Sequence, residues 1–213
     1  MTSPAQIRTT TGRTPGKRAL KTRQRLLSAT LALISQDSYR NVTVVQIARE
    51  AGTSSAAFYQ YFASVEDAVL DATEAIADQT RETLREFTDG SWVDEGPAGT
   101  RRWVDALLDC WNEHLVLMRI VTAVAAEEDP RFVRAYRRIA KPAASSLVSA
   151  IQHSNLPSTG GRTAKALANS LVTMLAASAG HESGGPVGGV SKSARRGSLA
   201  LVVHATVTGS PGQ

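Results

Sequence analysis

The sequence is poor in cysteine, in clustered metal ligands and in long apolar runs. A single cysteine, Cys110, excludes an intrachain disulfide and a cysteine-based zinc site. The four histidines are scattered, and no two lie at metal-ligand spacing. The longest charge-free apolar run, residues 166–180, is too short and too rich in alanine to span a bilayer, and no apolar signal segment opens the chain. The composition therefore predicts a cytoplasmic protein that uses no membrane, metal or cofactor.

Positive charge is concentrated at the N-terminus. The net charge is +5, but residues 1–25 hold seven lysines and arginines and no acidic residue, so the rest of the chain is slightly acidic. A cationic segment that leads into a helix favours a polyanionic partner, with nucleic acid as the first candidate. A basic tail without a specific partner is the alternative. Residues 1–17 are rich in Thr, Pro, Gly and Arg, and we expect them to form a disordered basic arm.

Apolar residues recur at helical spacing from residue 18 onward, and no alternating strand pattern interrupts them. The sequence therefore predicts an all-α fold of about nine helices. A glycine-rich loop at residues 181–191 separates the last two helices. The expected helices cover residues 18–35, 44–51, 55–62, 65–87, 100–113, 115–127, 130–153, 163–179 and 192–207.

The second and third predicted helices have the spacing of a helix-turn-helix. Thr43 and Ser54 are suitable N-caps for them, Gly52 is placed to end the first of the two, and Ser64 is placed to cap the helix that follows. In a helix-turn-helix, the first helix supports a second one whose N-terminal residues enter the DNA major groove. A plain helical hairpin is the alternative.

Four aromatic residues divide the third predicted helix into two faces. Phe58 and Phe62 lie four residues apart, so they should face inward, whereas Tyr59 and Tyr61 should lie on outer faces with hydroxyls that can reach phosphates. The cluster, the basic arm and the consecutive caps together favour a DNA-reading helix over a plain hairpin.

Residues 43–70 read T-x-x-x-I-A-x-x-A-G, x-S-x-x-x-F-Y-x-Y-F and x-S-x-E-D-A-V-L in succession. This run resembles the DNA-binding region of the TetR family of transcriptional regulators. Two positions depart from the family pattern. Val65 replaces a lysine that usually contacts a phosphate, and Gln60 stands after the tyrosine, where the family usually has a basic or polar residue. The N-terminal arm should therefore carry more of the DNA affinity. The resemblance and the basic start of the first helix give the predicted DNA-binding residues: Thr43, Ser54, Ser55, Ala57, Tyr59, Tyr61, Arg18 and Lys21.

The resemblance implies a division of the chain after this region. Residues 18–64 would form the helix-turn-helix domain, residues 65–208 a ligand-binding and dimerisation domain, and residues 209–213 a short tail. Within the larger part, residues 112–138 and the last two predicted helices are similar to the branch that includes the repressor of the ethionamide-activating monooxygenase.

The last two predicted helices carry apolar or small residues on every face. Residues 166–179 and 199–207 both show this pattern, which a surface helix of a monomer does not need. Two such helices from each subunit would form a four-helix dimer interface. The alternative is that both are core helices of a monomer.

Aromatic and polarisable residues on the middle helices predict a pocket for a hydrophobic small molecule. A plain core stripe is the alternative, since such spacing occurs in both. The predicted pocket residues are Trp103, Leu107, Cys110, Trp111, His114, Met118, Thr122, Tyr136, Asn169 and Met174, with Val121, Ala125, Phe132 and Thr173 beside them.

Together these features indicate a homodimeric, ligand-responsive repressor that binds a palindromic DNA operator and is released by a hydrophobic small molecule. Two other classes are weighed against it: a small all-helical enzyme and a sequence-blind architectural DNA binder. The glycine-rich residues 184–189 lack the lysine and hydroxyl of a phosphate-binding loop, and no strand precedes them. Nothing in the sequence favours catalysis, and a sequence-blind binder would not need the large apolar domain.

Overall fold

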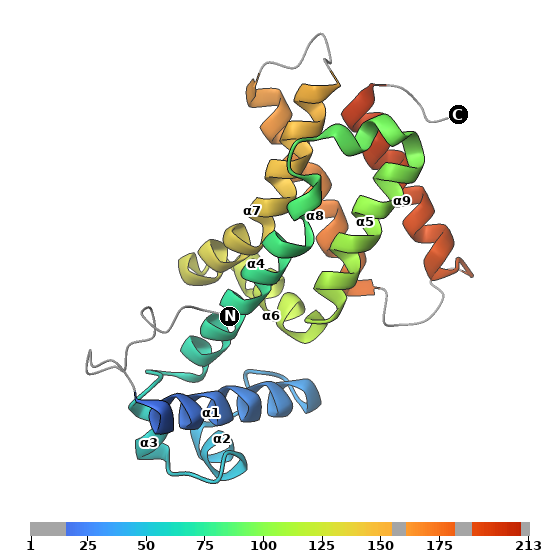
Figure 1. Cartoon of the computed structure of the whole chain (residues 1–213). Helices are drawn as coiled ribbons and strands as arrows, with labels where there is room; N and C mark the ends of the chain where they lie inside the picture. The colour runs from blue at the N-terminus through green and yellow to red at the C-terminus, as the bar shows by residue number, and fades with distance from the viewer. Residues whose placement is uncertain (1–15, 155–160, 182–188, 210–213) are drawn as a thin grey trace.

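The computed structural model describes residues 16–154, 161–181 and 189–209, and these residues are helical with short connections (Figure 1). The predicted all-α fold is confirmed. The expected arm and the glycine-rich part of the last loop lie outside the described residues, in whole or in large part. The helices are α1 (Lys17–Gln36), α2 (Val44–Glu50), α3 (Ser55–Tyr59), α4 (Val65–Thr83), α5 (Gly96–Asn112), α6 (Leu115–Ala126), α7 (Pro130–His153), α8 (Gly161–His181) and α9 (Lys192–Thr208).

Helices α1 to α3 form a small head, and α4 runs from the head into the larger body made of α4 to α9 (Figure 1). In the head, Leu26, Ile47 and Phe58 are fully buried and hold the three helices together. In the body, α7 packs against α4 on one side and against α6 and α8 on others, while α5 packs against α9. The buried residues of head and body form one continuous hydrophobic cluster.

The connection between α4 and α5 differs from the expected continuous helix to residue 87. Helix α4 ends at Thr83, a 3-10 helix covers Arg85–Phe87, and a second one covers Ser91–Glu95. Gly90 between them has φ +85°, and a Cβ there would lie 2.6 Å from the backbone of Ser149. Only glycine fits this approach, so the chain turns here and α5 begins at Gly96, earlier than predicted.

Tryptophan side chains form the centre of the body. The Trp92 and Trp103 rings stack with centroids 5.5 Å apart, and the Trp103 indole N–H donates to Ser146 Oγ at 3.0 Å. The Ser146 hydroxyl in turn donates to the Phe87 carbonyl at 2.6 Å, which also accepts the Trp92 N–H at 3.1 Å. Each buried polar atom of this group therefore has a partner, as a well-packed core requires.

Across the described ranges, no helix is long and apolar enough to cross a membrane.

Candidate functional site

The α2–α3 pair of the head is defined by side-chain caps. The Thr43 hydroxyl accepts the Gln46 backbone N–H at 3.3 Å, and the Gln46 side chain accepts the Thr43 N–H at 2.8 Å, which completes a capping box. Ser54 Oγ accepts the Ala57 N–H at 3.2 Å at the start of α3. Ser64 caps α4 in the same way. The three predicted caps are confirmed.

The turn between α2 and α3 depends on Gly52 and on an arginine that sequence reasoning missed. Gly52 has φ +60° and ends α2 as expected, and its N–H donates to the Arg49 carbonyl at 3.0 Å. The Arg25 guanidinium of α1 donates to the Ala51 carbonyl, so it ties the end of α2 to α1. A Cβ at Gly52 would lie 2.7 Å from this guanidinium, so a larger residue at this position would displace the arginine side chain.

Helix α3 presents one face to solvent and one to the core. Phe58 and Phe62 are buried with ring centroids 5.4 Å apart, as predicted. Tyr59 is 53% exposed, in agreement with its outer position. Tyr61 differs from the prediction, because it is half-buried and packs against the core. Helix α3 is also shorter than expected and ends at Tyr59.

The other predicted DNA-binding residues lie on or beside this face. Ser54 and Thr43 are exposed but already cap their helices, while Ser55 and Ala57 are half-exposed at the start of α3. Arg18 and Lys21 are exposed on the first turns of α1. The structure thus gathers small hydroxyl and methyl groups at the N-terminal end of α3, with Tyr59 at its C-terminal end.

A second arginine of α1 fixes the head to the body. Arg23 forms an ion pair with Asp71 of α4, and its guanidinium lies 5.3 Å from the centroid of the Phe62 ring. Burial raises the pKa of the Asp71 carboxyl, and the charge of Arg23 opposes that shift. Spacing alone does not reveal this pair, because its members lie 48 residues apart.

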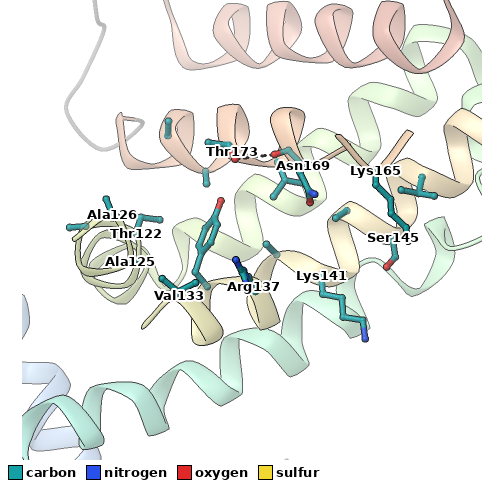
Figure 2. Close-up of a pocket in the computed structure, with 18 of the residues that line it drawn as sticks. Thr122, Ala125, Ala126, Val133, Arg137, Lys141, Ser145, Lys165, Asn169 and Thr173 are labelled. Carbon is teal, nitrogen blue, oxygen red and sulfur yellow. Dashed lines mark hydrogen bonds between the residues drawn. The ribbon is translucent and has the colours of Figure 1, made fainter. Parts of the chain in front are cut away.

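The body contains a large cavity between α6, α7 and α8 (Figure 2). Its volume is about 1250 Å³, which is ample for a drug-sized ligand. Alanine and valine residues make up much of its wall. Burial raises the pKa of the Tyr136 phenol, and a hydrogen bond with Thr173 across the cavity opposes that shift.

Of the predicted pocket residues, Thr122, Tyr136 and Asn169 line this cavity, together with Ala125 and Thr173. The other predicted residues are absent from the described wall, and most lie in the packed core. The reason is that their partners are core atoms: the Trp111 N–H donates to Thr80 Oγ1 at 3.2 Å, as the Trp103 N–H does to Ser146. The residues that the structure places away from the cavity wall are Trp103, Leu107, Cys110, Trp111, His114, Met118 and Met174.

His114 has a different role from the one predicted. Its Nε2 lies 2.6 Å from Gln79 Oε1 on α4, so it joins the α5–α6 junction to α4. Burial lowers the pKa of His114, and the nearby Glu113 carboxylate opposes that shift. Cys110 is buried with its sulfur 3.8 Å from Thr80 Oγ1, and burial raises the pKa of its thiol. This fits an inert core thiol.

The end of α6 connects the cavity wall to the head. Ala125 and Ala126 line the cavity, and the next residue, Glu127, accepts two hydrogen bonds at 2.5 Å from the guanidinium of Arg40, which lies between α1 and α2. Nearby, Arg131 of α7 lies 3.7 Å from Asp67 of α4. The cavity wall is therefore one residue away from a direct contact with the head.

Within the described part of the chain, no group of three or more His, Cys, Asp or Glu residues is arranged to hold a metal ion.

Two family models match most of the sequence. The model described as "Bacterial regulatory proteins, tetR family" matches residues 26–72, and the one described as "Tetracyclin repressor-like, C-terminal domain" matches residues 84–212. The chain belongs to the TetR family. It is therefore a DNA-binding transcriptional regulator with a helix-turn-helix head and a helical C-terminal domain, and regulators of this family are not enzymes. Operator binding, and usually dimerisation, is a property of the family.

Solved structures share the TetR fold of this chain at low sequence identity. The fatty acid degradation regulator FadR from Bacillus halodurans is 14% identical over 92% of this chain and 97% of its own, with a TM-score of 0.63. The regulator PfmR from Thermus thermophilus is 15% identical over 89% and 100%, with a TM-score of 0.58. The ketosteroid regulator KstR2 of Mycobacterium tuberculosis is 21% identical over 90% and 95%, with a TM-score of 0.55. A comparison with curated protein sequences gives no match.

Proposed function

We propose that this TetR-family protein is a homodimeric repressor whose head reads a palindromic operator through α3. The observation that carries the proposal is the exposed start of α3, where Ser55 and Ala57 are half-exposed and Tyr59 is 53% exposed. Hydroxyls there can bond phosphates or base edges, and a methyl can touch a thymine methyl. Arg18 and Lys21 on α1 supply positive charge toward the same partner.

The proposed dimer forms through α8 and α9. Leu201 and Val202 of α9 are 49% and 46% exposed, which is unusual for large apolar residues on one helix. Their neighbours Val203 and His204 are buried against the body, so α9 has one face packed and another available. A two-fold arrangement of such faces gives a closed dimer with two heads. Two heads one helical turn of DNA apart match a palindrome.

The proposed effector is a hydrophobic small molecule that occupies the α6–α7–α8 cavity. It can change DNA binding only if it binds the two head arrangements with different affinity. The contact between Glu127 and Arg40 supports a route from the cavity wall to the head through the end of α6. Helix α4 also connects the body to the head. It packs against α7 and does not line the cavity, so a ligand would move it through α7.

The DNA-binding part is tested by selecting operators from a random DNA pool and titrating the best palindrome. Tyr59→Phe removes one exposed hydroxyl and should weaken binding by about 1 kcal/mol, roughly fivefold, with little change in melting temperature. Thr88→Val is the control, since it removes the hydroxyl of an exposed residue of the body that does not line the cavity. Equal affinity for random and selected DNA would support a sequence-blind binder and contradict the proposal.

The dimer part is tested by light scattering on the purified chain. Leu201→Glu places a charge on the exposed face of α9 and should convert dimers to monomers. Val45→Glu changes an equally apolar residue on α2 that is 68% exposed, and the molar mass should stay that of a dimer. A wild-type protein that is monomeric at micromolar concentration would contradict the proposed interface.

Two finer assignments stay predictions from the sequence. These are the likeness to the branch of the ethionamide-monooxygenase repressor and the division of the chain at residues 64 and 65. Limited proteolysis of the full chain, with the fragments identified by mass, tests the division.

A further inference from the structure

The cavity between α6, α7 and α8 carries charge of one sign on its wall. The charged residues of the wall are Arg137 and Lys141 of α7 and Lys165 of α8, and among the described residues no aspartate or glutamate lines the cavity. Arg137 and Lys141 lie four residues apart, so both project from one face of α7. All three residues are exposed, so their charges are accessible to an entering ligand.

These cations lack the partner that the adjacent Arg138 has. Among the described residues, Arg137, Lys141 and Lys165 form neither an ion pair nor a side-chain hydrogen bond, whereas the adjacent Arg138 pairs with Glu74 of α4. Three unpaired positive charges beside one cavity raise the local potential and favour an incoming anion.

The two ends of the cavity differ in chemistry. At one end lie Ala125 and Ala126 of α6 and Val133 of α7, which give an apolar wall (Figure 2). At the other end the Lys165 side chain reaches from α8 toward Ser145 of α7 (Figure 2). Lys141 and Lys165 therefore give the cavity a cationic end near Ser145, opposite the apolar end beside α6, while Arg137 lies one helical turn from Val133 (Figure 2).

We propose that the effector of this regulator is an amphipathic anion. Its apolar tail lies against the α6 end of the cavity, and its carboxylate or phosphate head lies toward the Ser145 end, within reach of Lys141 and Lys165. Charge-assisted hydrogen bonds from ammonium groups are an ordinary means of holding such a head. The inference rests on the proposed function, because it names the class of ligand for the cavity assigned there.

The spacing of the lining residues sets the size of the tail. Val133 is the first α7 residue of the wall, and Ser145, near Lys165, lies twelve residues farther along, so a rise of about 1.5 Å per residue separates the two by about 18 Å. An unbranched chain of medium length fits this distance with its head at the cationic end. Each added methylene should then tighten binding about fourfold until the apolar end is full.

The test is calorimetric titration of the purified dimer with four probes that share one tail: decanoate, decyl phosphate, decanol and decyltrimethylammonium. Decanoate or decyl phosphate should bind about tenfold tighter than decanol, or more, and the cationic probe should bind most weakly. Whichever anion binds more tightly identifies the head as carboxylate or phosphate. Decanol binding as tightly as both anions, or no binding by any probe, would overturn the inference.

Variants locate the head. Lys141→Gln and Lys165→Gln should each reduce anion affinity and leave decanol affinity unchanged. Arg134→Gln is the matched control, because Arg134 is an exposed arginine of α7 that does not line the cavity. If Arg134→Gln reduces anion affinity as much as Lys141→Gln does, the charges act as a general surface field and the assignment is wrong.

Operator titrations on the same samples separate this inference from the proposed function. If the protein binds its operator and decanol releases it while the anions do not, the regulator stands and the anionic ligand is refuted. If no sequence-specific operator binding occurs, the proposed function fails, and the calorimetric preference for anions still decides the chemistry of the cavity.

Discussion

Filling the cavity with a side chain should imitate a bound ligand. Ala125 lies on the wall at the α6 end and is half-buried, whereas its neighbour Val124 is buried in the core. Ala125→Trp directs an indole into the open volume of about 1250 Å³, so packing strain is avoided and apolar surface is covered. A fully buried aromatic side chain stabilises a fold by about 1.5–3 kcal/mol, so the melting temperature should stay level or rise.

Val124→Trp gives the matched comparison, because the same indole then enters a packed core. Overpacking of this kind costs about 1–3 kcal/mol. For a chain of this size each kcal/mol shifts the melting temperature by about 2–4 °C, so a decrease of roughly 2–12 °C is expected. Both variants are compared at one protein concentration, since dimerisation also changes the melting temperature.

DNA titrations on the same samples complete the test. Ala125→Trp should weaken operator binding by an allosteric coupling of about 1–3 kcal/mol, which is roughly 5- to 150-fold. Val124→Trp should bind normally wherever it remains folded. The reasoning is refuted if Ala125→Trp melts early like the core variant and, while folded, binds the operator with wild-type affinity.

Three further changes test separate parts of the molecule. Deleting residues 1–15 removes Arg8 and Arg13, so the slope of log affinity against log salt should fall by roughly two; an unchanged slope in anisotropy titrations would mean that these residues do not contact DNA. Ser146→Ala deprives the buried Trp103 N–H of its acceptor and should cost about 1–3 kcal/mol in urea unfolding, whereas Ser149→Ala on the cavity wall should cost little. Burial lowers the pKa of His114, so the unfolded chain takes up a proton at this residue at a higher pH than the folded chain does. The contribution of neutral His114 to stability is therefore full above the ordinary pKa of 6.5, and it is lost as the pH falls from that value toward the lowered pKa. His114→Gln should therefore flatten the decrease in melting temperature between about pH 7 and pH 5, and an equally steep decrease would assign it to other groups.

The helix-turn-helix could be predicted because its determinants are local in the sequence. Thr43, Ser54 and Ser64 each bond a backbone N–H three residues later, so the residues that fix each helix start are visible in a short window. Gly52 is visible for the same reason, since a left-handed residue at a helix end favours glycine. The arginines Arg23 and Arg25 could not be assigned in this way, because their partners come from other helices.

The cavity could not be located from the sequence, because a stripe of large apolar residues is the same pattern in a core and in a pocket wall. Trp103 and Trp111 have the spacing of a lining, yet both are fully buried with their N–H groups bonded inside the body. The actual wall consists largely of alanines and other small side chains, such as Ala140 and Ala144 of α7. Open volume arises where helices that carry small residues face one another, which depends on tertiary packing.

The chain at the end of α6 gives the cavity a short path to the head. Helix α6 ends at Ala126 on the wall, Glu127 binds Arg40, and Glu128 has φ +63°, a conformation that is costly for a residue other than glycine. Asp129 then caps α7 at once, so the chain between the two helices has little slack to absorb a displacement of α6. A tail that pushes on Ala125 would therefore act first on the exposed ion pair between Glu127 and Arg40, which joins the end of α6 to the head. Because the cationic end of the cavity lies farther along α7, the proposed ligand would gain affinity at one end and act on the head at the other.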